Sequence, residues 1–585
     1  MTVGDFIVQR LRDWGVKQVF AYPGDGINGI VAAFGKADND PAFIQTRHEE
    51  MAAFAAVGYA KFSDEVGVCL ATSGPGAIHL LNGLYDAKLD HVPVVAIVGQ
   101  TARTAQGGSY QQEVDLHSLF RDVASFLVDV TVPEQLPNAL DRAMRTAAAD
   151  RAPAVLIIPN DVQEQDYEPP KHEFKYIPSS PPSRPSSCVV PANDEVRRAA
   201  EVLNTGEKVA ILIGQGARGA AAEVREVADL LGAGVAKALL GKDVLPDDLP
   251  YVTGSIGLLG TRPSYEMMRD CDRLLIVGSN FPYSQFLPEY GKARGVQIDV
   301  DGRSIGMRYP TEVNLVGDAR ETLRALIPLL ERKNDRSWRQ TIEKNTKRWW
   351  EVVERQAHAP ADPVNPMLIV SELSKRLPAN AIVTADSGSA TNWYARLLRI
   401  HGNVRSSLSG TLATMGCAVP YALGAAFAKP SQPLIALVGD GAMQMNGMAE
   451  LLTLRHHNIR CVVCVFHNND LNQVTWELRA MGGAPKFEVS QELPDVSYAA
   501  YARSIGLQGI EVDSPDQLGP AWETALASDG TVVLDVRCDP NVPPIPPHAT
   551  FDQIKDMTEA VLRGDPDAWD VLRRGLTTKI QELLP

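Results

Sequence analysis

The sequence predicts an α/β protein with three doubly wound domains, each built on a parallel sheet. Its 585 residues exceed what one hydrophobic core organises, since domains commonly hold about 100–200 residues. Two stretches rich in Pro or Ser, residues 168–191 and 357–366, divide the chain into segments of ordinary domain size. Within each segment, short β-branched runs alternate with Gly-rich or polar turns and helical stretches. This order is typical of parallel strands covered by helices on both faces.

We expect domains at residues 1–167, 190–335 and 360–550, followed by a helical tail at 551–585. The strand-and-turn pieces are residues 17–26, 66–76 and 92–100 in the first segment, 209–216, 273–280 and 295–301 in the second, and 381–389, 433–441 and 531–537 in the third. In such folds, ligands bind at the carboxyl ends of the strands, where these turns fall. One Gly-rich turn is explained equally well by turn geometry, but several at corresponding positions favour nucleotide-like ligands.

Two local patterns are structural. Residues 1–15 alternate apolar and charged side chains, which predicts an amphipathic helix and lacks the apolar core of a signal peptide. Cys461 and Cys464 form a C-x-x-C motif within an apolar run. Residues three apart in a strand point to opposite faces, so we expect two buried thiols and neither a redox nor a zinc pair.

Composition restricts the partners and the compartment. The chain carries 56 basic and 71 acidic residues, a net charge of −15, which argues against nucleic acid or an anionic membrane as the main partner. No run approaches the ~18 apolar residues of a membrane span. Seven scattered cysteines suit a reducing compartment. We therefore expect a cytoplasmic protein, with peripheral contact at the inner face of the membrane left open.

Asp440 and Asn469 follow two neighbouring apolar runs, 29 positions apart. A strand–helix–strand unit of that length returns the chain beside its start, so both side chains can face one point above the sheet. Carboxylate, amide and carbonyl oxygens are hard ligands that suit Mg²⁺ together with phosphate. Taken alone, the Gly-Asp-Gly turn is better explained by an Asp helix cap and an Asn turn.

Gly-Asp-Gly followed at this distance by two Asn after an apolar strand resembles the signature of the thiamine diphosphate-dependent enzymes. The resemblance implies pyrimidine-binding, central FAD-binding-like and diphosphate-binding domains in that order. It also implies that Asp440, Asn469 and the carbonyl of Leu471 bind Mg²⁺. The residues that the resemblance places around thiamine diphosphate are Ser387, Gly388, Ser389, Ala413, Thr414, Met415, Asp440, Gly441, Ala442, Asn469, Leu471, Asn472 and Gln473.

Two further segments resemble parts of the same family. Residues 47–60 are similar to its cofactor-activating segment, which implies that Glu49 is the catalytic group. A carboxyl group facing the pyrimidine stabilises the imino tautomer, whose nitrogen takes the proton from the thiazolium carbon. Residues 409–426 resemble the segment that bends the cofactor, with the unbranched Met415 as the wedge between its rings.

Among thiamine enzymes, the chain is most similar to the quinone-linked bacterial pyruvate oxidases, with the acetolactate synthases next. The resemblance covers residues 3 to about 560 and implies an FAD site in the central domain, where Asp299 accepts a ribose hydroxyl. The implied FAD residues are Gly257, Leu258, Leu259, Gly260, Gly278, Ser279, Asn280, Phe281, Pro282, Asp299, Arg303, Ser304 and Asp318. The alternative is a central domain that no longer binds a nucleotide.

The chain departs from the oxidases at three places. Gln111 stands where they have Phe, the loop after Asn469 differs, and residues 567–585 form a plausible amphipathic helix without the membrane-docking pattern. The first two departures lie where the substrate pocket is expected. The substrate-pocket candidates are Gly26, His91, Gln111, Gln112, Trp476 and Glu477.

These observations leave three functional hypotheses. The first is a pyruvate oxidase-like oxidoreductase that decarboxylates a 2-oxo acid, with pyruvate as the default, and passes the electrons of the enamine to FAD and then to a quinone or oxygen. The second is a carboligase resembling acetolactate synthase, or a non-oxidative decarboxylase, with FAD structural or absent. The third, a nucleotide-binding regulator, is disfavoured because Glu49 and Asp440 are both present.

The two halves of the expected cofactor site lie in different domains. Glu49 belongs to the first segment and Asp440 to the third. The family joins these halves across a subunit interface, which implies a homodimer at least and commonly a homotetramer.

Overall fold

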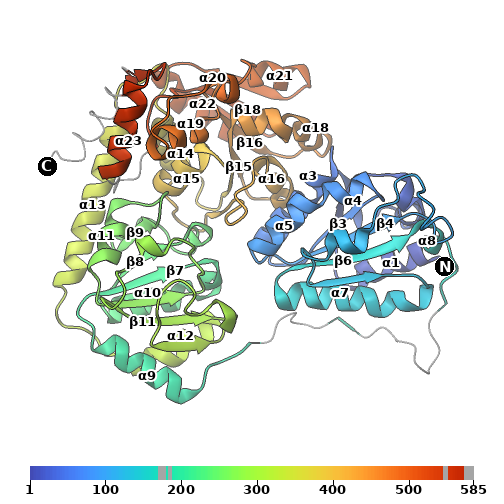
Figure 1. Cartoon of the computed structure of the whole chain (residues 1–585), viewed down its shortest axis with the longest axis horizontal. Helices are drawn as coiled ribbons and strands as arrows, with labels where there is room; N and C mark the ends of the chain where they lie inside the picture. Colours follow the sequence, from blue (N-terminus) through green and yellow to red (C-terminus); the bar gives the residue numbers. More distant parts are fainter. Residues whose placement is uncertain (169–179, 182–187, 545–550, 569, 572–585) are drawn as a thin grey trace.

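In a computed structural model, the chain forms three sheets of six strands. The structure describes residues 1–168, 180–181, 188–544, 551–568 and 570–571. Every pair of neighbouring strands within the sheets is parallel. Helices cover the sheets on both faces (Figure 1). The predicted class, three doubly wound α/β domains, is confirmed.

The N-terminal domain has the strand order β2-β1-β3-β4-β6-β5. Its strands are β1 (Gln18–Ala21), β2 (Ala42–Gln45), β3 (Gly67–Ala71), β4 (Val94–Gln100), β5 (Phe126–Asp129) and β6 (Pro153–Pro159). Its main helices are α1 (Val3–Asp13), α2 (Asn28–Lys36), α3 (Glu49–Ser63), α4 (Pro75–His79), α5 (Leu81–Leu89) and α7 (Leu136–Asp150). Val94 and Ala96 enter one hydrophobic core and Val95 and Ile97 another, because alternate side chains of a covered strand point to opposite faces.

The central domain has the order β12-β11-β10-β7-β8-β9. Its strands are β7 (Val209–Ile213), β8 (Gly234–Lys237), β9 (Val252–Ser255), β10 (Arg273–Val277), β11 (Arg294–Asp299) and β12 (Val313–Val316). Its main helices are α9 (Asn193–Asn204), α10 (Ala221–Leu230), α11 (Arg262–Asp270) and α12 (Ala319–Leu326), and α13 (Ser337–Ala357) leads to the third domain.

The C-terminal domain has the order β14-β13-β15-β16-β18-β17. Its strands are β13 (Ile382–Ala385), β14 (Arg405–Ser407), β15 (Leu434–Gly439), β16 (Cys461–His467), β17 (Gln508–Val512) and β18 (Val532–Arg537). Its main helices are α14 (Pro366–Arg376), α15 (Ser389–Leu397), α16 (Ala418–Ala428), α17 (Asp440–Ala442), α18 (Met448–His456), α19 (Asn472–Met481), α21 (Tyr498–Ser504), α22 (Pro515–Ala527) and α23 (Phe551–Leu562). Cys461 and Cys464 are buried free thiols in different cores, so that prediction is confirmed.

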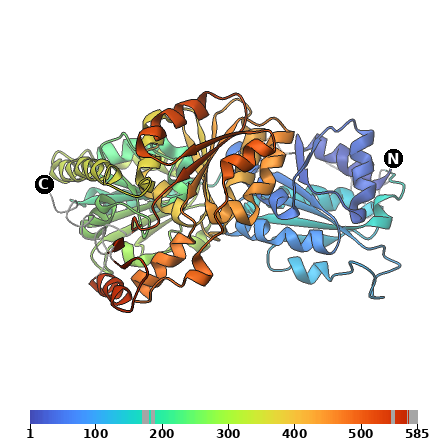
Figure 2. The same ribbon diagram turned by 90° about the horizontal axis from the view of Figure 1, so that it is seen from above.

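The C-terminal domain contacts both other domains, and Figure 2 shows the N-terminal domain at one end of the molecule. Helix α3 packs tightly on α16: a Cβ at Gly424 would lie 2.1 Å from the carbonyl oxygen of Ala55, and one at Gly58 would lie 2.6 Å from Cα of Tyr421. Only glycine permits such a close approach of two helices. The N-terminal and C-terminal domains therefore share one hydrophobic core.

The remaining predictions concern the ends and linkers. Helix α1 is present as expected, and α13 ends and α14 begins at the bounds of the second linker. Most of the first linker and most of the tail segment 567–585 lie outside the described residues. Among the described residues, no helix combines the length and the apolar character needed to cross a membrane.

Candidate active site

In each sheet, candidate residues cluster at a point where the strand order reverses. In an open α/β sheet, the carboxyl ends of the two strands at this point leave a crevice that receives ligands. The strands concerned are β1 and β3, β7 and β10, and β13 and β15. The turns that follow them are residues 22–26 and 72–76, 214–216 and 278–282, and 386–389 and 439–442.

Asp440 is a buried carboxylate at the start of α17, with 3% of its surface exposed. Its Oδ2 accepts hydrogen bonds from the backbone N–H groups of Asn468 (2.8 Å) and Asn469 (2.6 Å), and its Oδ1 accepts from that of Gly441 (2.9 Å). Burial raises the pKa of Asp440 to about 6, although these hydrogen bonds lower it. A divalent cation beside this carboxylate would offset the cost of burying its charge.

The other two predicted metal ligands lie next to Asp440 but make other contacts. Asn469 holds a left-handed backbone conformation (φ 55°), and its Oδ1 lies 2.8 Å from His467 Nε2. The Leu471 carbonyl accepts from the backbone N–H groups of Val474 (2.9 Å) and Thr475 (3.2 Å) at the start of α19. A carbonyl has two lone pairs and both accept here, so metal binding at Leu471 requires one of these hydrogen bonds to be released. The Asn469 amide must likewise turn away from His467. The oxygen-rich donor set fits Mg²⁺.

The predicted diphosphate loop and Met415 meet at the same end of the sheet. Asp386 is fully buried, and its carboxylate accepts from the backbone N–H groups of Ser387 (2.9 Å), Gly416 (2.8 Å) and Ala418 (3.0 Å), which ties the two segments together. A Cβ on Gly441 would lie 3.2 Å from the Met415 methyl group. Met415 therefore lies against the Gly-Asp-Gly turn. Three further predicted cofactor residues begin the helices beside these turns: Ser389 in α15, and Asn472 and Gln473 in α19.

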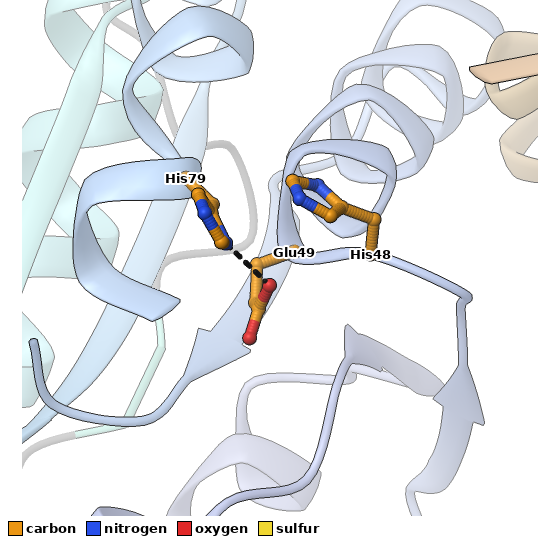
Figure 3. A group of neighbouring side chains, drawn as sticks. All are labelled: His48, Glu49 and His79. Atoms are coloured by element: carbon orange, nitrogen blue, oxygen red, sulfur yellow. Dashed lines mark hydrogen bonds and ion pairs between the residues drawn. The ribbon is translucent and has the colours of Figure 1, made fainter. Parts of the chain in front are cut away.

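Glu49 begins α3 in the N-terminal domain (Figure 3), with 8% of its surface exposed. His79 at the end of α4 places its Nδ1 2.9 Å from Glu49 Oε2. The ring of His48 lies 4.2 Å from that of His79. The contact with His79 fixes Oε2 of Glu49 and leaves Oε1 for a ligand. Oε1 lies beside the turn that contains Gly76, because a Cβ on Gly76 would lie 3.1 Å from it.

Two substrate-pocket candidates gather at the same turn as Glu49. The backbone N–H of Gly26 donates to Thr72 Oγ1 (2.9 Å), and Ser73 Oγ donates to Gln112 Oε1 (3.1 Å). Gln111 is exposed beside them. The other three candidates, His91, Trp476 and Glu477, lie elsewhere, on the wall of a large cavity. The candidates thus form two groups within one chain.

The cavity has a volume of about 1330 Å³ and is lined by residues of all three domains, most of them from the central and C-terminal domains. Most of the predicted FAD residues line it: Leu258, Leu259, Gly278, Ser279, Asn280, Phe281, Pro282, Asp299, Arg303, Ser304 and Asp318. Gly257 and Gly260 do not, although they flank Leu258 and Leu259 in sequence. Its other end is lined by four of the predicted thiamine residues, Ser387, Gly388, Ala413 and Gln473.

The central-domain wall has features that fit a dinucleotide. Asn280 Oδ1 is buried without a hydrogen-bond partner, and a cavity ligand could donate to it. Gly278 has a positive φ of 58°, and a Cβ there would lie 2.5 Å from Cα of Gly216, so the backbone turns after β7 and β10 approach each other closely. Asp318, by contrast, caps α12 by accepting from the backbone N–H of Glu321 (3.0 Å).

Sequence reasoning missed part of this wall. Gly214, Gln215 and Gly216 line the cavity beside Gly278, together with Arg218. The sequence feature that could have identified these residues is the Gly-rich turn after the apolar run of β7, at the point where the strand order reverses.

Comparison with known proteins identifies the family. Residues 1–119 match the N-terminal TPP binding domain of the thiamine pyrophosphate enzymes, residues 196–326 the central domain, and residues 386–536 the C-terminal TPP binding domain. The chain belongs to the thiamine pyrophosphate (thiamine diphosphate) enzyme family, as the sequence motifs predicted. Each matched range falls inside one of the three predicted domains.

The relatives span more than one activity. The chain is 37% identical over 96% of both chains to the "Putative thiamine pyrophosphate-containing protein YdaP" of Bacillus subtilis. It is 32% identical to the acetolactate synthase isozyme 2 large subunit of Escherichia coli, over 94% of this chain and 98% of that one. It is 29% identical to the pyruvate oxidase of Lactiplantibacillus plantarum, over 91% and 88%. The family is therefore established, and the reaction within it is a separate question.

Proposed function

We propose that this enzyme decarboxylates a 2-oxo acid, with pyruvate as the default, and transfers the resulting electrons to FAD. The observation that carries the proposal is the cavity: the FAD-like turns of the central domain line one end, and the diphosphate loop at Ser387 and Gly388 lines the other. Two cofactors bound at these ends would lie in one continuous space. Pyruvate oxidase activity in a relative supports the same assignment.

The residues around Asp440 would hold the metal and the diphosphate. Asp440, Asn469 and Leu471 supply the oxygen ligands, and the backbone N–H groups at the start of α15 and α17 face the phosphate positions. When bound, thiamine diphosphate would supply the nucleophilic carbon and the electron sink that decarboxylation of a 2-oxo acid needs. Met415, beside Gly441, would hold the cofactor in its bent shape.

Glu49 would hold and move the proton that activates the cofactor. His79 fixes one oxygen of its carboxyl group at 2.9 Å, so the other oxygen faces the turn formed by residues 72–76. No residue of that turn lines the large cavity at whose far end Gly388 lies. We therefore propose that Glu49 of one chain and Asp440 of a second chain complete each site, which requires at least a homodimer.

A second candidate function is carboligation or non-oxidative decarboxylation. It is favoured by the similarity to acetolactate synthase and by Gln111, an exposed amide where the oxidases have Phe. In this case, Trp476 and Glu477 on the cavity wall would receive a second carbonyl substrate, and FAD would be structural or absent.

One spectrum distinguishes the two functions. The purified protein is placed under anaerobic conditions with Mg²⁺ and thiamine diphosphate, and its visible spectrum is recorded before and after pyruvate is added. We expect a flavin spectrum that bleaches, and no bleaching in a control from which thiamine diphosphate and Mg²⁺ are omitted. A flavin that stays oxidised while CO₂ is released would instead establish the second function. If neither changes, a panel of 2-oxo acids replaces pyruvate.

A further inference from the structure

Helix α5 carries a stripe of polar side chains on one face. Asn82, Asp86 and Asp90 are spaced four residues apart, which places them in one row along a helix. All three contact the loop between β14 and α16, here called the Met415 loop (residues 408–415). A helix of the N-terminal domain therefore holds a loop of the C-terminal domain.

Asp90, at the end of the stripe, binds the start of the loop. Its Oδ1 accepts from the backbone N–H of Thr411 (2.8 Å) and its Oδ2 from that of Gly410 (2.9 Å). Lys61 Nζ donates to the same Oδ2 (2.7 Å) and to the carbonyl of Leu408 (2.6 Å). The Asp90 and Lys61 side chains are 0% and 2% exposed, so this ion pair is fully desolvated and its hydrogen bonds are satisfied by the loop.

Asn82 binds the other end of the loop, and Asp86 is linked to that end through Ser409. Ser409 Oγ donates to Asp86 Oδ1 (2.6 Å) and accepts from the backbone N–H of Thr414 (3.1 Å). Asn82 Nδ2 donates to Thr414 Oγ1 (3.0 Å). The hydroxyl of Tyr421 contacts the second oxygen of Asp86. A chain of hydrogen bonds thus runs from α5 to the residue immediately before Met415.

The loop lies between the two candidate cofactor positions. Ser409, Gly410, Thr411 and Ala413 line the large cavity, whereas Met415 lies against the Gly-Asp-Gly turn. Burying two carboxylates is costly, and apolar residues of similar volume often pack with less cost. A buried polar network whose hydrogen bonds are satisfied holds the groups that it joins in one conformation. Here it holds the Met415 loop.

We propose that Asn82, Asp86 and Asp90 are positioning residues that fix the Met415 loop for thiamine diphosphate. The inference rests on the proposed function only in that Met415 is taken to contact the cofactor. It needs no assumption about the substrate or about FAD. If the stripe only joined two domains, a substitution in it would lower the unfolding temperature. It would not lower the affinity of the folded protein for the cofactor.

Two serines provide a matched pair of variants. Ser409→Ala removes the hydroxyl that links Asp86 to Thr414, and leaves both without that partner. Ser407→Ala removes the hydroxyl of a serine that is buried to the same degree, 1% exposed, but whose Oγ has no hydrogen-bond partner. Both changes delete one buried oxygen, and only the first breaks the link from Asp86 to Thr414.

The test is calorimetric titration of the metal-loaded protein, freed of thiamine diphosphate, with that cofactor. We expect Ser409→Ala to raise the dissociation constant about tenfold and Ser407→Ala to leave it near that of the unchanged protein, because loss of a partner for buried polar groups carries a large penalty. Thermal unfolding of both variants is measured in parallel. At saturating cofactor, the near-ultraviolet circular dichroism of the bound cofactor should differ only in Ser409→Ala.

Equal affinities in the two serine variants would overturn the proposal. If Ser409→Ala does not fold, Asn82→Ala replaces it in the same titration, and an unchanged dissociation constant there would overturn the proposal as well. The outcome is separate from that of the proposed function. If the protein binds thiamine diphosphate but turns over no 2-oxo acid, the proposed function is wrong and this inference is unaffected. If the protein is a decarboxylase but both serine variants bind the cofactor equally well, this inference is wrong and the proposed function is unaffected.

Discussion

Glu49→Gln is expected to remove most of the turnover while leaving the affinity for thiamine diphosphate nearly unchanged. Gln has the shape of Glu but cannot exchange the proton, and general acid–base groups contribute about 10²–10⁴-fold to rates. The side chain is nearly buried and held by His79 at 2.9 Å, so a substitution of the same shape should keep its place. Turnover of the 2-oxo acid and calorimetric affinity for the cofactor are measured on the same preparation.

Glu223→Gln is the matched control for this prediction. Glu223 is also 8% exposed and lies in the first turn of a helix, α10 of the central domain, where it pairs with Arg324. Glu223→Gln removes the ion pair with Arg324. Because the Arg324 side chain is 55% exposed, this ion pair contributes little to the free energy of unfolding, and we expect turnover to stay within about twofold. Unchanged turnover in Glu49→Gln, or an equal loss in both variants, would contradict the role assigned to Glu49.

The fold could be predicted from the sequence wherever a strand is covered on both faces. The apolar runs of β10 and β15 stand out because both sides of these strands enter a core. The edge strands β9 and β14 were not predicted. Their sequences, Val-Thr-Gly-Ser and Arg-Ser-Ser, carry little apolar periodicity, because an edge strand has only one neighbour and β14 is only three residues long.

The candidate site could be predicted from the sequence only where its residues follow strands. Asp440 and Asn469 are brought together by adjacent parallel strands, as their spacing indicated. The contact of Asp86 with Ser409 joins positions 323 residues apart, and it depends on how α5 packs against a loop of another domain. Local periodicity contains no information about that packing.

Asp440→Ala is expected to weaken Mg²⁺ and thiamine diphosphate binding together. The carboxylate is the one charged oxygen donor among the three proposed ligands, and it also orders Asn469 by accepting from its backbone N–H at 2.6 Å. Loss of a partner that only orients a metal ligand costs about 10–100-fold in affinity, so loss of the ligand itself should cost at least about 100-fold. Titration of the cofactor at several Mg²⁺ concentrations measures both affinities.

Asp539→Ala separates loss of the metal from loss of structure. Asp539 has the same exposure, 3%, and its carboxylate also accepts from backbone N–H groups, those of Asp362 (2.9 Å) and Asn541 (2.8 Å). The two variants therefore remove similar buried hydrogen bonds within one domain. If the site at Asp440 holds Mg²⁺, high Mg²⁺ should partly restore cofactor binding in Asp539→Ala but not in Asp440→Ala. Retained affinity at limiting Mg²⁺ in Asp440→Ala would remove Asp440 from the metal site, and the diphosphate would then depend on the backbone N–H groups of α15 and α17 alone.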